Sequence, residues 1–133
     1  MERVELNAGN GRRLFLERVS GRDVDPVWSF RATLLVQEAT VTTIVYEHGR
    51  RLVAYFRELA DGWRGFDGVT SFVSLEGQLM IDASHDGLGT VWCDVRLREP
   101  ARPTWDFGAS LGVEAGTQLD KLAGEIDTFV GDR

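Results

Sequence analysis

The sequence has few of the residues on which thiol, metal or membrane functions depend. It contains a single cysteine, Cys93, so an internal disulfide and any site that needs two thiols are excluded. We expect Cys93 to be a small buried hydrophobic residue. No apolar run approaches the ~18–20 residues of a membrane-spanning helix, and the N-terminus lacks the apolar region of a signal peptide. These absences favour a soluble cytoplasmic protein with no membrane partner.

The common catalytic patterns are also missing. The two histidines, His48 and His85, do not form H-x-x-x-H, and the chain has no H-E-x-x-H, phosphate-binding loop or dinucleotide fingerprint. In residues 108–112 the serine is one place out of frame for a nucleophile elbow. No cofactor is therefore expected. The question of enzymatic activity stays open, with a non-catalytic role favoured.

Positive charge is scarce in the second half of the chain. Up to Phe66 there are 10 Arg and Lys residues against 9 Asp and Glu, and from Asp67 onward there are 5 against 12. The net charge of −6 is therefore carried by the second half. An acidic surface repels nucleic-acid phosphates, so no nucleic-acid partner is expected. The same charge is suited to a basic protein partner.

What the sequence does contain is alternation. Apolar and polar residues alternate with a period of two over residues 28–36, 79–84, 91–98 and 104–113, and strand patterns also cover 3–7, 13–19 and 41–46. One-sided alternation is typical of antiparallel sheets. Asparagine and glycine at residues 7–11, and Asp86-Gly87 with Gly89 at residues 85–89, predict hairpin turns.

Two segments change to a helical period. Apolar residues recur at helical spacing over 52–59, closed by Asp61-Gly62, and over 119–130. Thr117 and Asp120 have the spacing of a capping box at the start of the second helix. We therefore predict one α+β domain over residues 1–133, with an antiparallel sheet of about seven strands in the order ββββαβββα and two amphipathic helices.

The segment between the first helix and the next predicted strand, residues 63–77, is the least regular part of the chain. Glycines free its backbone while aromatic residues, including Trp63, pin it to something apolar. Such a segment is either a binding loop or a packed crossover, and both interpretations stay open. The residues that could move a proton or hold a metal are Asp67, Glu76, His85 and Asp86. Their alternative roles are in turns and at the sheet edge, and no metal site is predicted.

Trp92 falls on the polar side of its strand, next to Asp94 and Arg96. A tryptophan there is either covered by a helix or is a binding anchor. We expect a helix to cover it.

Motifs of the second half carry a resemblance: Trp63-Arg64-Gly65-Phe66, Ser74-Leu75-Glu76-Gly77, His85-Asp86-Gly87-Leu88-Gly89-Thr90-Val91, the strand at Trp105 and the helix over 119–129. On these residues the chain resembles an uncharacterised family of small, mostly actinobacterial domains. More loosely, it resembles WapI-type immunity proteins of bacterial toxin systems. The uncharacterised family implies no activity. The immunity proteins imply a non-catalytic domain that binds and blocks a cognate toxin.

No residue pattern specifies a function, so three hypotheses remain. The favoured one is a non-catalytic protein-binding domain of the immunity type, for which the candidate binding residues are Trp63, Asp67, Glu76, His85, Asp86 and Trp92. The second is a small enzyme or metal-binding protein that uses Asp67, Glu76, His85 and Asp86. The third is a structural domain that self-associates, forming a homodimer through an exposed strand or Trp92.

Overall fold

The computed structural model describes residues 2–19, 28–100, 102 and 104–131. Its elements are β1 (Arg3–Gly9), β2 (Arg12–Arg18), β3 (Trp28–Val36), β4 (Ala39–Glu47), α1 (Gly49–Asp61), β5 (Thr70–Val73), β6 (Leu79–His85), β7 (Thr90–Arg98), β8 (Asp106–Glu114) and α2 (Thr117–Gly131). The α+β class, the antiparallel pairing and the two helices are confirmed.

The strands form two sheets and not one. Sheet A has the order β1-β2-β3-β4 and sheet B the order β5-β6-β7-β8, with every neighbouring pair antiparallel. The strand that the sequence pattern missed is β5, which lies inside the segment expected to be irregular. It has four residues, of which only Phe72 is buried, so it shows almost no alternation.

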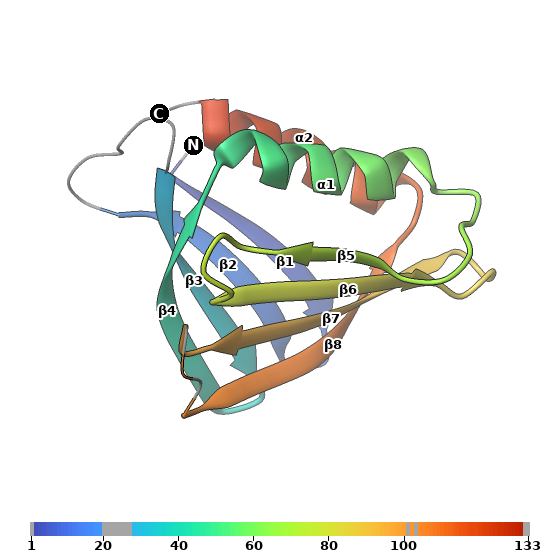
Figure 1. The fold of residues 1–133 in the computed structure, drawn as a ribbon. Coiled ribbons are helices and arrows are strands. Elements are labelled where there is room, and N and C mark those ends of the chain that lie inside the picture. Colours follow the sequence, from blue (N-terminus) through green and yellow to red (C-terminus); the bar gives the residue numbers. More distant parts are fainter. Residues whose placement is uncertain (1, 20–27, 101, 103, 132–133) are drawn as a thin grey trace.

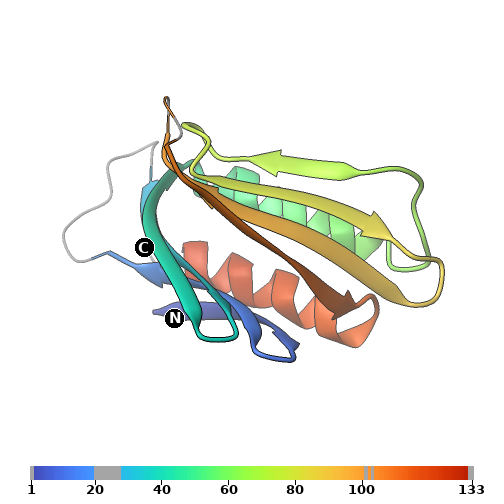
Figure 2. The same ribbon diagram turned by 90° about the horizontal axis from the view of Figure 1, so that it is seen from below.

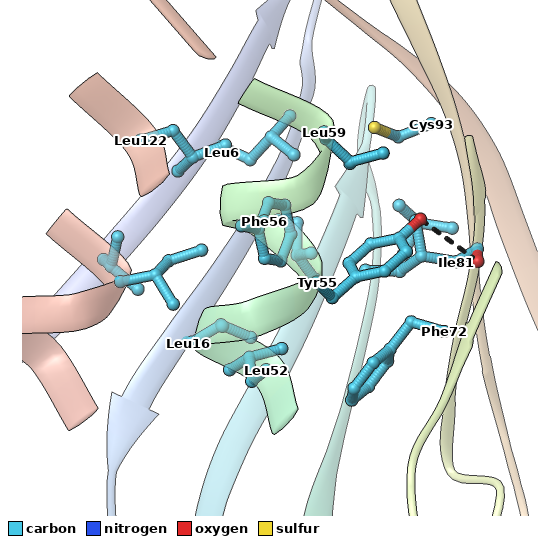
Figure 3. Packing of buried hydrophobic residues seen from close by; sticks show 14 of the residues in the cluster. Leu6, Leu16, Leu52, Tyr55, Phe56, Leu59, Phe72, Ile81, Cys93 and Leu122 are labelled. Carbon is cyan, nitrogen blue, oxygen red and sulfur yellow. Dashed lines mark hydrogen bonds between the residues drawn. The ribbon is translucent and has the colours of Figure 1, made fainter. Parts of the chain in front are cut away.

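Both helices lie side by side on the inner side of the two sheets (Figures 1 and 2). The inward side chains of both sheets and the apolar faces of the helices form one hydrophobic cluster. Figure 3 shows α1 in the middle of this cluster, with Phe56 directed toward sheet A and α2, and Tyr55 toward sheet B. In the described part of the chain, no helix packs on the opposite face of sheet B, which we call its outer face.

The ends of the helices are formed by different devices. As predicted, α1 ends at Gly62, whose backbone N–H donates to the carbonyl groups of Glu58 and Leu59. The predicted capping box at the start of α2 is wrong. The carboxylate of Glu114 accepts the N–H groups of Gly116 (2.7 Å) and Gln118 (2.9 Å) in its place. These hydrogen bonds lower the pKa of Glu114.

Burial in the core makes the Cys93 thiol unreactive. Its side chain is completely buried, as expected, and burial raises the pKa of the thiol to about 12. Within the described ranges, neither helix combines the length and the apolar character needed to cross a membrane.

Candidate functional site

The connection from α1 to β5 and the β6–β7 hairpin meet at one end of sheet B (Figure 1). His85 joins them. Its Nδ1 accepts the N–H of Gly87 (2.9 Å), so the ring proton sits on Nε2, which donates to the carbonyl oxygen of Trp63 (2.9 Å). The ring of Phe66 contacts the imidazole edge-on at 5.7 Å. Both nitrogens of His85 are therefore used to fasten the two segments together.

Asp86 is a turn residue. Its Oδ1 accepts the backbone N–H groups of Leu88 (2.7 Å) and Thr90 (3.1 Å). These two hydrogen bonds are the main reason that its pKa is lowered, with the Trp92 side chain contributing. The flanking glycines have positive φ, 75° at Gly87 and 96° at Gly89, as the tight hairpin requires.

The four residues of the enzyme or metal hypothesis are not brought together. Asp67 is exposed in the α1–β5 connection and follows Phe66, whose ring contacts His85. Glu76 lies in the β5–β6 turn, where it accepts a hydrogen bond from Gln78 (3.1 Å). That turn is at the opposite end of β6 from His85, about 20 Å away for a seven-residue strand. Among the residues that the structure describes, no three His, Cys, Asp or Glu side chains are placed to hold a metal ion.

Exposed hydrophobic side chains gather on and around sheet B. In the described part of the chain, the large exposed hydrophobic residues are Tyr46, Trp63, Val69, Val73, Leu75, Leu88, Trp92 and Trp105. All except Tyr46 belong to sheet B or to the segments that border it. Trp63 is 49% exposed and Leu88, at the hairpin tip, is 89% exposed. Concentration of such residues on one sheet is typical of an interaction surface.

Trp92 lies on the outer face of sheet B and is 39% exposed. The expectation that a helix covers it is wrong, because both helices pack on the inner side. Instead, its ring leans over Gly112 of β8, the residue directly opposite in the register. A Cβ atom at Gly112 would lie 3.0 Å from the ring, so this glycine makes room for the indole. The tryptophan is thus held in place with one side open to solvent.

A polar row crosses the outer face next to Trp92. Ser71, Asp82, Asp94 and Ser110 stand opposite one another on β5, β6, β7 and β8. Ser71 donates to Asp82 Oδ1 (2.6 Å), and Ser110 donates to Asp94 Oδ1. The two carboxylates at the centre of the row are direct cross-strand neighbours. Like charges in this position repel each other and lower stability.

A shallow hollow of about 450 Å³ lies beside this row. Asp82, Asp94, Arg96, Asp106 and Ser110 line it, together with backbone around Gly108. The guanidinium of Arg96 forms two hydrogen bonds with Asp106, at 3.1 and 2.8 Å. This contact lowers the pKa of Asp106 and occupies Arg96, so the cation nearest to the row is already paired.

The repulsion in the polar row gives a testable prediction. We expect Asp82→Asn to raise the free energy of unfolding by about 0.2–1 kcal/mol, because it removes a like-charge pair while its amide oxygen can still accept the Ser71 hydroxyl. Urea denaturation of the variant measures the change. Asp67→Asn, the same substitution at an exposed loop position, is the control and should leave stability nearly unchanged. A less stable Asp82→Asn variant would show that the carboxylate pair does not repel.

Five of the six candidates, Trp63, Asp67, His85, Asp86 and Trp92, gather at the hairpin end of sheet B, and Glu76 does not. Asp82 and Asp94 were missed as site residues. Both fall on the polar side of their strands in the sequence pattern, so their common exposure was readable. Their adjacency was not, because it depends on the register between β6 and β7.

Comparison with known proteins agrees with the uncharacterised family and adds no function. No curated protein and no solved structure matches the chain. A family model described as "Family of unknown function (DUF6228)" matches residues 12–133. The match runs from β2 to the C-terminus and includes the whole of sheet B and both helices. The chain therefore belongs to the DUF6228 family.

Proposed function

We propose that this chain is a non-catalytic protein-binding domain of the bacterial cytoplasm, with the outer face of sheet B as its binding surface. The observation that carries the proposal is Trp92, held half-open on a sheet face that no helix covers. Buried aromatic anchors dominate the energetics of protein interfaces, and tryptophan is the most enriched of them. Trp92 is positioned by Gly112 before any partner arrives, which reduces the entropy lost on binding.

The surroundings of Trp92 support the same proposal. Val73 lies on the same face of the sheet and is 43% exposed. The β6–β7 hairpin, which carries Leu88, and Trp63, whose carbonyl oxygen accepts a hydrogen bond from His85, border the end of this face. The polar row lies between Trp92 and Val73, so two aspartates separate these exposed apolar side chains on the same face. Apolar anchors flanked by charge are suited to a partner that is bound and released as a folded protein.

The finer proposal is that the domain neutralises a toxin by masking it, as immunity proteins do. The resemblance of the hairpin and loop motifs to WapI-type immunity proteins supports it. An acidic inhibitor surface also suits a basic target, because opposite charges accelerate association. This form of the proposal requires a cognate target encoded near the gene for this chain.

Co-expression with the products of neighbouring genes tests the proposal. We expect one of them to co-purify with the wild-type chain, and Trp92→Ala to weaken that complex by about tenfold or more. Tyr46→Ala is the control, since Tyr46 is similarly exposed at 43% but lies on sheet A. Binding is measured by calorimetry after circular dichroism has shown that both variants are folded.

Two results would contradict the proposal. One is that no neighbouring gene product binds the chain. The other is that the Trp92 and Tyr46 variants bind equally well, which would place the interface elsewhere. A dimer that dissociates on dilution and is lost in Trp92→Ala would instead favour the self-association hypothesis.

A further inference from the structure

We infer that the open edge of β8 binds an extended, positively charged segment of the partner protein, which pairs with residues 106–112 as an additional strand of sheet B. This inference rests on the proposed function and names the way in which the partner is held. It follows from the direction of the backbone groups of β8, from the position of the Trp92 indole and from the charge of this half of the chain.

β8 is the last strand of sheet B, and β7 is its one neighbour among the described strands. Beyond the two ends of their register, the N–H of Ala115 donates to the carbonyl oxygen of Gly89 (2.8 Å), and the N–H of Glu99 donates to that of Trp105 (3.4 Å). Odd-numbered residues on the β8 side therefore point their backbone groups toward β7, and the register between them has no shift. Because these directions alternate along a strand, the even-numbered residues of β8 point their N–H and carbonyl groups away from β7.

Three of these outward-pointing residues, Gly108, Ser110 and Gly112, have free backbone groups. Within residues 2–19, 28–100, 102 and 104–131, their N–H and carbonyl groups form no hydrogen bond. Sheet A approaches β8 without pairing with it. Gly108 and Ser110 are exposed, so the edge is accessible. An open edge of this kind is a template for main-chain pairing with a foreign strand.

The centre of this edge lacks the features that prevent pairing on other edge strands. Between its first and last residues β8 has no charged residue and no proline, and its pairing with β7 has no register shift. On β5 the edge-facing carbonyl oxygen of Val73 is occupied by Arg51. On β1 the register shifts after Asn7, whose carbonyl oxygen accepts a hydrogen bond from Gln118. Of the two edges of sheet B, that of β8 is therefore the one suited to an added strand.

The indole of Trp92 leans from β7 across β8 toward this edge. A Cβ atom at Gly112 would lie 3.0–3.2 Å from Cζ3, Cη2 and Cε3 of Trp92, which belong to the six-membered ring. Because Gly112 has no side chain, the ring covers its position on the outer face. The residue that pairs with Gly112 on an added strand would lie about 5 Å from it, and its side chain would contact the ring. An added strand would thus bury Trp92, as a binding anchor requires.

The charge of the chain favours a positively charged occupant and selects β8. The chain from Asp67 onward, which contains all of sheet B, has 5 Arg and Lys residues against 12 Asp and Glu. Opposite charge accelerates the association of a basic segment with this half. β4, at one edge of sheet A, also has edge-facing residues between Thr40 and Ile44. It belongs to the half in which 10 basic residues nearly balance 9 acidic ones, so it offers no such attraction.

A second copy of this chain fits the edge poorly. The symmetric register that pairs the three free residues with one another is centred on Ser110. It places Asp106 of each copy opposite Glu114 of the other, and like charges in this position are destabilising. Each copy also carries a net charge of −6. The occupant is therefore a segment of a different protein.

Nuclear magnetic resonance titration of the full ¹⁵N-labelled chain tests the inference. The probe is a blocked lysine peptide, acetyl-Lys-Val-Thr-Val-Thr-Val-Lys-amide. The control peptide, acetyl-Lys-Val-Pro-Pro-Thr-Val-Lys-amide, has the same charge but cannot pair as a continuous strand through either edge. We expect the lysine peptide to shift the amide protons of Gly108, Ser110 and Gly112 downfield as they gain a hydrogen bond. Ala109 and Leu111, which already pair with β7, should shift less. Added salt should weaken the binding, and the control peptide should leave these signals in place.

Proline at the edge provides the quantitative result. The N–H of Ser110 points away from β7, so Ser110→Pro removes a donor for the added strand and no hydrogen bond between β7 and β8. We expect it to weaken binding of the lysine peptide by about tenfold. Thr42→Pro is the matched control, because it removes an edge-facing N–H from β4 and, like Ser110→Pro, one hydroxyl hydrogen bond. It should bind as the wild type does. Circular dichroism verifies that both variants are folded, and the titration of the wild-type chain does not depend on them.

The inference is overturned if the lysine peptide shifts no amide of β8, if the control peptide causes the same shifts, or if Ser110→Pro binds as tightly as Thr42→Pro. A dimer in sedimentation that Ser110→Pro abolishes would also overturn it, because the occupant would be a second copy. The co-purified complex separates this failure from failure of the proposed function. Weakening of that complex by Trp92→Ala, with no effect of Ser110→Pro, would leave the binding face in place and exclude strand pairing at β8. No effect of either variant would refute both.

Discussion

Replacing Phe56 by alanine is expected to lower the free energy of unfolding by about 3–5 kcal/mol, one of the two largest effects that we predict. Phe56 is 1% exposed and lies at the point where α1, α2 and sheet A meet (Figure 3). It lines a small internal gap together with residues of β1, β2 and α2. Its ring also packs edge-on against Tyr55 at 5.3 Å. Removing it leaves a cavity that three separate elements would have to close.

Urea denaturation followed by tryptophan fluorescence measures the effect. Tyr46→Ala is the control for loss of an aromatic side chain, and because Tyr46 is 43% exposed it should change stability by no more than about 0.5 kcal/mol. If Phe56→Ala were as mild as this control, α1 would not be packed against sheet A and α2 as described.

The second large effect is expected for Arg51→Ala. Glu47 is completely buried at the junction of β4 and α1, and both of its carboxylate oxygens accept hydrogen bonds from Arg51 Nη1, at 2.7 and 2.9 Å. Burial raises the pKa of Glu47, and the nearby Arg51 partly offsets this. Without Arg51 the buried carboxylate loses its guanidinium partner and keeps the backbone hydrogen bond of His48. Because the arginine is itself 48% exposed, we expect a loss of about 2–3 kcal/mol, toward the low end for buried pairs.

The pH dependence of this loss identifies its cause. A carboxyl whose pKa is raised on folding takes up a proton more readily in the folded state than in the unfolded state. Its destabilising effect therefore diminishes as the pH falls toward 4.5, the ordinary value for glutamate. The loss in free energy of unfolding caused by Arg51→Ala should therefore become smaller over the same pH range. Arg50→Ala is the control, since its ion pair with Asp127 is exposed and should be worth less than about 1 kcal/mol. A loss of stability that does not change with pH would show that Arg51 stabilises through contacts other than its ion pair with Glu47, such as its hydrogen bond to the carbonyl oxygen of Val73.

The secondary structure was largely readable from local patterns. Alternation in residues 79–84 and 91–98 placed β6 and β7 with the correct inward residues, and the helical spacing over 52–59 placed α1. The strand β5 was missed because a four-residue edge strand with one inward residue, Phe72, has no period to detect. The division into two sheets was also missed. Alternation shows which side chains share a face but not which strands are neighbours.

The site was less predictable for the same reason. Trp63, His85 and Trp92 stand out in the sequence as residue types, and turn chemistry correctly identified the role of Asp86. Asp82 and Asp94 become notable only as a facing pair, 12 positions apart in the chain but opposite in the register. The prediction for the start of α2 was wrong for a different reason. Thr117 has the capping spacing, but the N–H of Asp120 donates to the backbone carbonyl of Gly116, and the carboxylate of Glu114 caps the helix by accepting the N–H groups of Gly116 and Gln118.

The contacts between α1 and β5 limit the ways in which sheet B can meet another protein. β5 is an edge strand, and an open edge invites a foreign strand to pair with it. Here the hydroxyl of Tyr55 donates to the carbonyl oxygen of Thr70 (2.8 Å), and the guanidinium of Arg51 donates to that of Val73 (3.3 Å). Side chains of the helix thus occupy backbone acceptors at both ends of β5. The carbonyl oxygen of Val73 faces the open edge, so a foreign strand that paired with β5 would have to displace Arg51, and this contact hinders extension of sheet B at β5.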